Sequence, residues 1–85
     1  MGDRKLSKYK KRIDFVIGCI IEAHGGLEVG SEIISERFLA IDTGIGRQSL
    51  REAFAVLQYH GFISCVHGKS KTVLRDLKGW DNVKV

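Results

Sequence analysis

The residues best suited to binding chemistry are the polar ones in the run Arg47-Gln48-Ser49-Leu50-Arg51. Arg47 and Arg51 are one helical turn apart, so a helix would present both guanidinium groups on one side. Long hydrogen-bond donors of this kind suit the base edges and phosphates of a DNA major groove. The two arginines are therefore the first candidates for a binding site, with a solvated charged surface as the alternative.

No arrangement of residues indicates catalysis or a metal site. His60, Cys65 and His67 are close in the sequence, but their spacing matches no zinc pattern. The segment Gly44-Ile45-Gly46 is too short for a nucleotide-binding fingerprint and does not follow a strand. Cys19 and Cys65 lie far apart and do not make a disulfide framework. We expect a reduced, cytoplasmic protein with no enzymatic activity, no cofactor and no metal.

The composition is that of one small domain. The chain has 85 residues, of which 44% are hydrophobic and 28% charged, which is close to the globular average. Its longest apolar run, Phe15–Ile21, is too short to cross a bilayer, and no signal-peptide cleavage site follows it. We therefore expect neither a disordered chain nor a membrane-spanning or secretory segment.

Charge is unevenly distributed around a net value of +4. Residues 1–12 carry six basic side chains and one acidic one, residues 13–46 carry six acidic and one basic, and residues 47–75 carry five basic and one acidic. A basic beginning and a basic second half around an acidic middle suggest one face built for a polyanion. Ordinary surface lysines of a soluble protein are the alternative.

Apolar spacing and boundary residues predict three helices followed by a hairpin. The helices are expected over residues 8–24, 36–42 and 47–60, and the strands over residues 62–66 and 71–75. Glycines after the first and third helices act as C-caps, and the serine before the second acts as an N-cap. A short extended stretch separates the first two helices.

The same spacing predicts a single core. In the third helix, the apolar stripe consists of Leu50, Ala53, Phe54 and Leu57. The second helix is expected to bury Phe38, Leu39 and Ile41. Leu50, Phe54 and Leu57 are expected to face Ile17, Ile20 and Leu39.

The segment Thr43–Gly46 has the features of the turn in a helix-turn-helix motif. Ile45 is the apolar residue that such a turn tucks between the helices. The hairpin that follows the motif has Gly68 at its tip, between His67 and Lys69, and a narrow basic tip can lie along a DNA backbone or enter a minor groove. We therefore predict an α+β, mostly α fold: a winged helix-turn-helix with three helices plus a two-stranded β-wing.

Spaced motifs over residues 30–68 resemble the DNA-binding domain of GntR-type transcription regulators. The matching positions are Gly30, Ser35-Glu36-Arg37-Phe38-Leu39-Ala40, Gly44-Ile45-Gly46-Arg47, Leu50-Arg51-Glu52-Ala53-Phe54, Leu57, Gly61-Phe62-Ile63 and His67-Gly68-Lys69. The His-Gly-Lys tip and Trp80 after it are most similar to the FadR-like branch. With the first helix and the second wing strand, the resemblance covers residues 8–76.

The resemblance implies sequence-specific binding of double-stranded DNA in transcription regulation, with no membrane partner. The DNA-binding residues that it implies are Arg37, Arg47, Gln48, Ser49, Arg51, His67, Gly68 and Lys69. The chain departs from the family pattern in two places. Gly46 replaces the usual Ser or Thr, which removes a side-chain cap and a phosphate contact, and Ile34 stands where proline is common.

Structural roles remain open for some of the charged residues. Arg37 could pair with Glu36 or Asp42 instead of contacting DNA. Glu36 is otherwise expected only to favour the start of the second helix through its charge. Glu52 is expected to be the structural partner of a nearby arginine rather than a reader of bases.

The predicted organisation has three parts: a basic flexible tail over residues 1–7, a winged-helix DNA-binding domain over residues 8–76, and residues 77–85 as a linker or the truncated start of an effector domain. Members of the family are dimers on palindromic operators. The resemblance therefore implies a homodimer, formed on DNA or through a missing C-terminal domain, and makes the chain a fragment or an unusually short member. The alternative function is a winged-helix protein–protein interaction module with an acidic partner.

Overall fold

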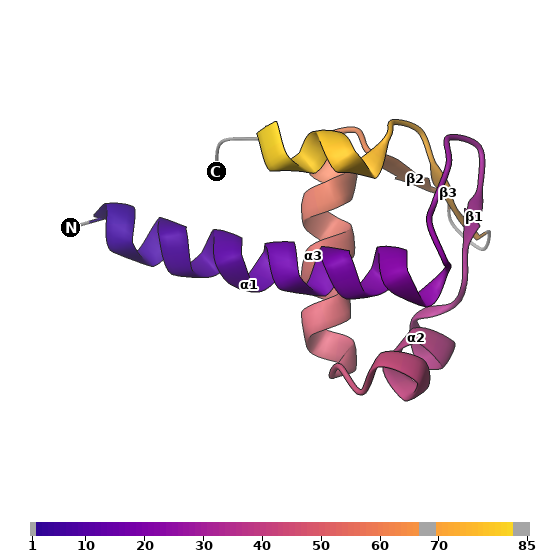
Figure 1. The fold of residues 1–85 in the computed structure, drawn as a ribbon, viewed down its shortest axis with the longest axis horizontal. Helices are drawn as coiled ribbons and strands as arrows, with labels where there is room; N and C mark the ends of the chain where they lie inside the picture. The colour runs from indigo at the N-terminus through magenta and orange to yellow at the C-terminus, as the bar shows by residue number, and fades with distance from the viewer. Residues whose placement is uncertain (1, 67–69, 83–85) are drawn as a thin grey trace.

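The structure is a computed structural model that describes residues 2–66 and 70–82 (Figure 1). Its order confirms the predicted succession of helix, helix, turn, helix and hairpin, with a short strand and a 3₁₀ helix in addition. The elements are α1 (Gly2–Ala23), β1 (Glu32–Ile33), α2 (Glu36–Thr43), α3 (Arg47–Tyr59), β2 (Ile63–Cys65), β3 (Lys71–Val73) and η1 (Leu77–Asn82).

The first helix is longer than the sequence predicts. It begins at Gly2 and not at Lys8, so residues 2–7, expected as a flexible tail, continue the helix. No proline or glycine interrupts the chain between Gly2 and Gly18, and the lysines and arginines there are good helix formers. In Figure 1, the N-terminal half of α1 extends past the other elements, while its second half crosses α3.

The boundary between α1 and the next strand follows the predicted pattern. Gly25 has a φ of 67°, in the left-handed region that a glycine reaches without a steric penalty. The ring of His24 lies close by, with Nδ1 2.7 Å from the carbonyl oxygen of Ile20 and Nε2 accepting from the amide of Ile34 at 3.0 Å. His24 therefore links the end of α1 to the segment that leads into α2.

Local hydrogen bonds define the turn between α2 and α3. The hydroxyl of Ser35 accepts from the amide of Phe38 at 3.3 Å, which confirms the predicted N-cap. The hydroxyl of Thr43 donates to the carbonyl of Leu39 at 2.6 Å and accepts from the amide of Ile45 at 3.2 Å. These bonds hold the turn so that Ile45, half-buried, packs against the core as predicted.

The sheet has three strands, and not the two predicted for the wing. Its order is β1-β3-β2, and both pairs are antiparallel, with Glu32 opposite Thr72 and Ile63 opposite Val73. The amide of Gly30 also donates to the carbonyl of Val73 at 2.8 Å. A strand of two residues is too short to show alternation in a sequence, so only its partner reveals it.

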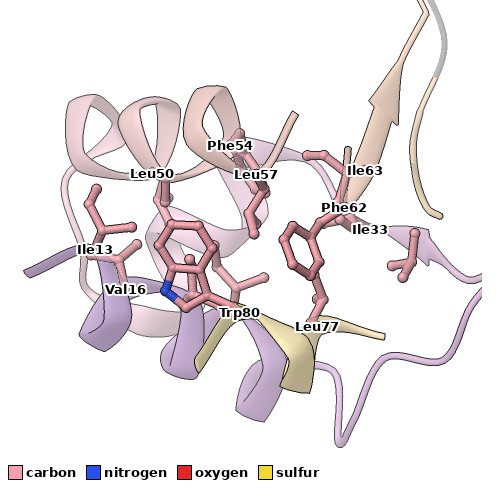
Figure 2. Packing of buried hydrophobic residues seen from close by; sticks show 14 of the residues in the cluster. Ile13, Val16, Ile33, Leu50, Phe54, Leu57, Phe62, Ile63, Leu77 and Trp80 are labelled. Atoms are coloured by element: carbon pink, nitrogen blue, oxygen red, sulfur yellow. The ribbon is translucent and has the colours of Figure 1, made fainter. Parts of the chain in front are cut away.

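The core lies between the three helices and the sheet (Figure 2). The six residues expected to face one another are all buried: Ile17, Ile20, Leu39, Leu50, Phe54 and Leu57. Other buried members of the cluster come from α1, the sheet, the residue before β2 and η1, and include Ile13, Val16, Ile33, Phe62, Ile63, Val73, Leu77 and Trp80. One core thus connects all the elements, as the spacing predicted.

The predicted burial of Phe38 and Ile41 is wrong. Phe38 is 64% exposed and Ile41 is 73% exposed, whereas Leu39 between them is fully buried. Successive residues of a helix are about 100° apart, so a two-turn helix that points Leu39 inward must point Ile41 outward. The half-buried Ala40 supplies the rest of the inner side of α2.

Residues 77–82 belong to the packed domain and are not a linker. Leu77 and Trp80 point from η1 into the core, each at most 3% exposed (Figure 2). The Trp80 ring meets that of Phe62 edge-on, with ring centres 6.1 Å apart, and its indole N–H donates to the carboxylate of Asp14 on α1. The predicted boundary at residue 76 therefore cuts through a packed unit, and residues 83–85 lie outside the described structure.

The described residues form neither a membrane-spanning helix nor a metal-binding group. Within residues 2–66 and 70–82, no helix combines the length and apolar character needed to cross a bilayer. In that part of the chain, no three His, Cys, Asp or Glu side chains lie where they could share a metal ion.

Candidate nucleic-acid interface

The third helix has two chemically different sides. Its inner side is apolar and consists of Leu50, Ala53, Phe54 and Leu57. Its first two turns present the arginines outward: the side chains of Arg47 and Arg51 are 56% and 59% exposed. Gln48 is also exposed, and Ser49 is half-buried. The structure therefore gathers the four sequence-predicted residues at one end of α3.

Glu36, the first residue of α2, binds both arginines. Its Oε1 atom accepts from Arg47 Nε at 2.8 Å and from Arg51 Nε at 3.0 Å, and its Oε2 atom lies 3.2 Å from Arg51 Nε. The glutamate side chain is only 15% exposed, far less than either arginine. A single carboxylate thus joins the start of α2 to two successive turns of α3. We call Glu36, Arg47 and Arg51 the arginine cluster.

The cluster keeps its carboxylate ionised. Burial raises the pKa of Glu36, but the hydrogen bond from Arg47 and the positive charges of Arg51 and Arg47 outweigh that effect and leave the pKa below its ordinary value. With one negative and two positive groups, the cluster has a net charge of +1 at neutral pH. The exposed arginines therefore still attract an anion.

The start of α3 has no side-chain cap. Gly46 occupies the N-cap position, and no side chain accepts a hydrogen bond from the first turn there. Glycine at this position thus leaves the first amide groups of α3 for solvent or for a bound anion.

Glu52 lies on another side of α3 and has a structural role. Its carboxylate pairs with the guanidinium of Arg12 on α1. This pair confirms the prediction that Glu52 binds an arginine and links the two longest helices. Glu52 is therefore not part of the arginine cluster: its partner, Arg12, is on α1, whereas the carboxylate of the cluster, Glu36, is on α2.

The remaining predicted site residues are placed less fully. Arg37 is exposed on α2, and within the described residues no hydrogen bond or ion pair engages its side chain, so it does not pair with Glu36 or Asp42 there. His67, Gly68 and Lys69 lie outside the described residues. Lys71, the first basic residue after them, places its ammonium group 4.6 Å from the centre of the Phe54 ring.

Comparisons with known proteins bear on the fold. No protein-family model matches the chain, and neither does any curated protein. A solved structure described as "GntR family transcriptional regulator from Listeria monocytogenes" is similar to it, with a TM-score of 0.61 and 23% sequence identity over 87% of this chain. The fold is a winged helix. The match covers 63% of that regulator's length.

One member of the winged-helix site escaped the sequence reasoning. The sequence predicted that Glu36 favours the start of α2 or pairs with Arg37, yet its carboxylate binds two residues of α3. Arg47 and Arg51 lie 11 and 15 positions further along the chain, beyond any helical repeat. The helix-turn-helix turn between α2 and α3 is the sequence signal that could have predicted the contact of Glu36 with these arginines. Such a turn brings the start of α2 near the start of α3.

Proposed function

We propose that this chain is the DNA-binding domain of a GntR-like transcription regulator and binds a specific sequence in double-stranded DNA. The observation that carries the proposal is the exposed basic end of α3, a helix whose other side is buried in the core. The similarity in fold to a GntR family transcriptional regulator adds support. The His67-Gly68-Lys69 sequence favours the FadR-like branch.

In this proposal α3 enters the major groove, as the second helix of a helix-turn-helix does. Arg47 and Arg51 donate to base edges, for which a bidentate contact with guanine is the most frequent arginine contact. Gln48 and Ser49 contact bases or phosphates beside them. The uncapped amides at the start of α3 provide a further anchor for a phosphate.

Contacts outside α3 complete the proposed interface. Arg37 on α2 is exposed and reaches a phosphate or base edge beside the recognition helix. Residues 67–69, between β2 and β3, bring His67, Gly68 and Lys69 to the backbone or the minor groove. We further propose that two copies occupy the half-sites of a palindromic operator, because a single domain reads only one half-site.

The test begins with a duplex selected from a randomised library by the wild-type protein, and a scrambled duplex of equal length. Fluorescence anisotropy gives the affinity for each at several salt concentrations. We expect tighter binding to the selected duplex and a loss of about 0.9 log units in affinity per log unit of salt for each phosphate contact.

Single substitutions make the test specific to α3. Arg47→Ala and Arg51→Ala should each weaken binding to the selected duplex, whereas Lys78→Ala, which removes the same charge from η1, should change it little. The proposal would be contradicted if the selection enriched no sequence and every duplex bound with the same weak affinity. That result would favour the alternative function, a protein–protein interaction module with an acidic partner.

A further inference from the structure

The arginine cluster contains a negative charge at the centre of the surface proposed to meet DNA. A carboxylate so close to phosphates opposes binding by Coulomb repulsion. A glutamate at this position is therefore expected to have a second, favourable effect that offsets the repulsion. Its low exposure and its hydrogen bonds to two exposed arginines indicate that this effect acts through the arginine side chains.

Glu36 engages the arginines through particular atoms. Both guanidinium groups use Nε–H toward the carboxylate, and within the described residues no hydrogen bond engages the Nη atoms of Arg47 or Arg51. A guanidinium has five N–H groups in a rigid plane, so occupying Nε leaves the outer Nη edge with four. That edge is the part of the side chain that can donate two parallel bonds to a guanine.

We infer that Glu36 is a specificity-determining positioning residue, which holds the side chains of Arg47 and Arg51 with their Nη edges turned toward the bases. The inference rests on the proposed function and deepens it. An arginine side chain has several rotatable bonds and loses rotamer entropy when it binds. A partner that restricts those bonds before DNA arrives reduces that loss for the correct base sequence.

Two opposite consequences follow from this arrangement. The repulsion between Glu36 and phosphates acts on every duplex, whatever its sequence. The ordering of Arg47 and Arg51 helps only where the bases match their Nη edges. Glu36 therefore weakens general binding and strengthens discrimination, whereas a carboxylate without a positioning role would only weaken binding.

The ionised state of the carboxylate supports this inference over the pH range of binding experiments. The two arginines hold the pKa of Glu36 below its ordinary value despite partial burial, which raises it. The hydrogen-bond acceptor pattern of the cluster is therefore constant near neutral pH. Any change in DNA affinity between pH 6 and 8 would therefore come from groups other than Glu36.

The experiment compares Glu36→Gln with wild type on the selected and the scrambled duplex. Glutamine has nearly the same size, but it lacks the charge and has a single acceptor oxygen beside a donor amide. We expect the scrambled duplex to bind about twofold tighter, since one phosphate-repelling charge is gone. The selected duplex should bind about fivefold more weakly, so the affinity ratio falls about tenfold.

Glu28→Gln is the matched control. Glu28 is exposed in the segment between α1 and β1, and the substitution removes the same charge. Both duplexes should respond to it alike, with the ratio unchanged. If wild type discriminates and Glu36→Gln keeps the wild-type ratio, the positioning role is wrong and the proposed function remains. If wild type itself does not discriminate, the proposed function fails and this inference with it.

A second measurement works without DNA and guards against a simple loss of folding. In NMR spectra of the nitrogen-labelled protein, the Nε–H protons of Arg47 and Arg51 should exchange with water more slowly than that of Arg37, because hydrogen bonding protects them. In Glu36→Gln, with backbone signals still those of the folded domain, their exchange should approach that of Arg37. Equal fast exchange of all three in wild type would overturn the inference.

Discussion

The outward faces of α2 and α3 differ in chemistry although the two helices share one core. The outward side of α3 is basic, with Arg47 and Arg51 held by Glu36. The outward side of α2 is apolar: Phe38 and Ile41 are exposed, and with Ile34 and Asp42 they line a shallow hollow. The difference shows that apolar residues in a short helix are weak evidence of burial. Exposed charged residues that a neighbouring side chain holds in place, as Glu36 holds the two arginines, are better evidence of a ligand-binding surface.

The largest expected effect compares one phenylalanine from each helix. Phe54 on α3 is buried, and Phe54→Ala should lower the free energy of unfolding by about 3–5 kcal/mol. Phe38 on α2 is mostly in water, so Phe38→Ala should lower it by less than about 1 kcal/mol. Urea denaturation followed by circular dichroism measures both. Equal losses for the two variants would mean that the outward side of α2 is buried after all.

Arg47→Ala tests whether the outward side of α3 reads bases. Loss of a bidentate base contact should weaken binding to the selected duplex by about 1–3 kcal/mol and relax the preference at that position. The affinity for the scrambled duplex should fall only by the electrostatic contribution of the Arg47 charge. Anisotropy titrations of the two duplexes measure the difference. A loss of equal size on both would reduce Arg47 to a phosphate contact.

The acid sensitivity of the arginine cluster is a smaller effect. The pKa of Glu36 is lowered in the folded state from an ordinary value of 4.5, so its ion pairs stabilise the fold above about pH 4.5. This contribution is lost as the pH falls through the lowered pKa, and for exposed arginines it amounts to about 0.2–1 kcal/mol.

Comparison of wild type with Glu36→Gln isolates this effect from the other carboxylates. Unfolding free energies at a series of pH values should show wild type losing more stability than the variant below pH 4.5. The two should run parallel from pH 5.5 to 8. Parallel curves throughout would mean that the ion pairs do not stabilise the fold.

The smallest expected effect comes from the apolar side of α2. Ile41 points outward, so Ile41→Ser should change the free energy of unfolding by no more than about 0.5 kcal/mol. Its effect on the affinity for the selected duplex should stay within about twofold, because neutral contacts at a rim contribute little. If Ile41→Ser weakened DNA binding as much as Arg47→Ala, the interface would extend over α2.

Much of the fold could be predicted from local features. Ser35 caps α2 as expected, and the stripe Leu50–Leu57 is buried because helical spacing directly determines which residues share a side. The errors fall where several answers satisfy the same spacing. In α2, Phe38, Leu39 and Ile41 point in three directions, and no local rule says which of them the core takes.

For the candidate site, the sequence by itself determined that Arg47, Gln48, Ser49 and Arg51 share the start of one helix. It also determined the turn before them and the buried stripe that turns them outward. These features depend on spacing, capping and turn residues within a few positions of one another, where backbone geometry leaves few alternatives.

Only the tertiary structure decided which distant residues meet. It placed Glu36 between Arg47 and Arg51, added β1 to the hairpin, and brought Trp80 to Asp14 across 66 positions of the chain. Such contacts depend on how helices cross and strands pair, and their net free energy includes the entropy of closing long loops. Periodicity contains no information on that geometry, so the carboxylate that orders the proposed recognition surface became visible only in the folded chain.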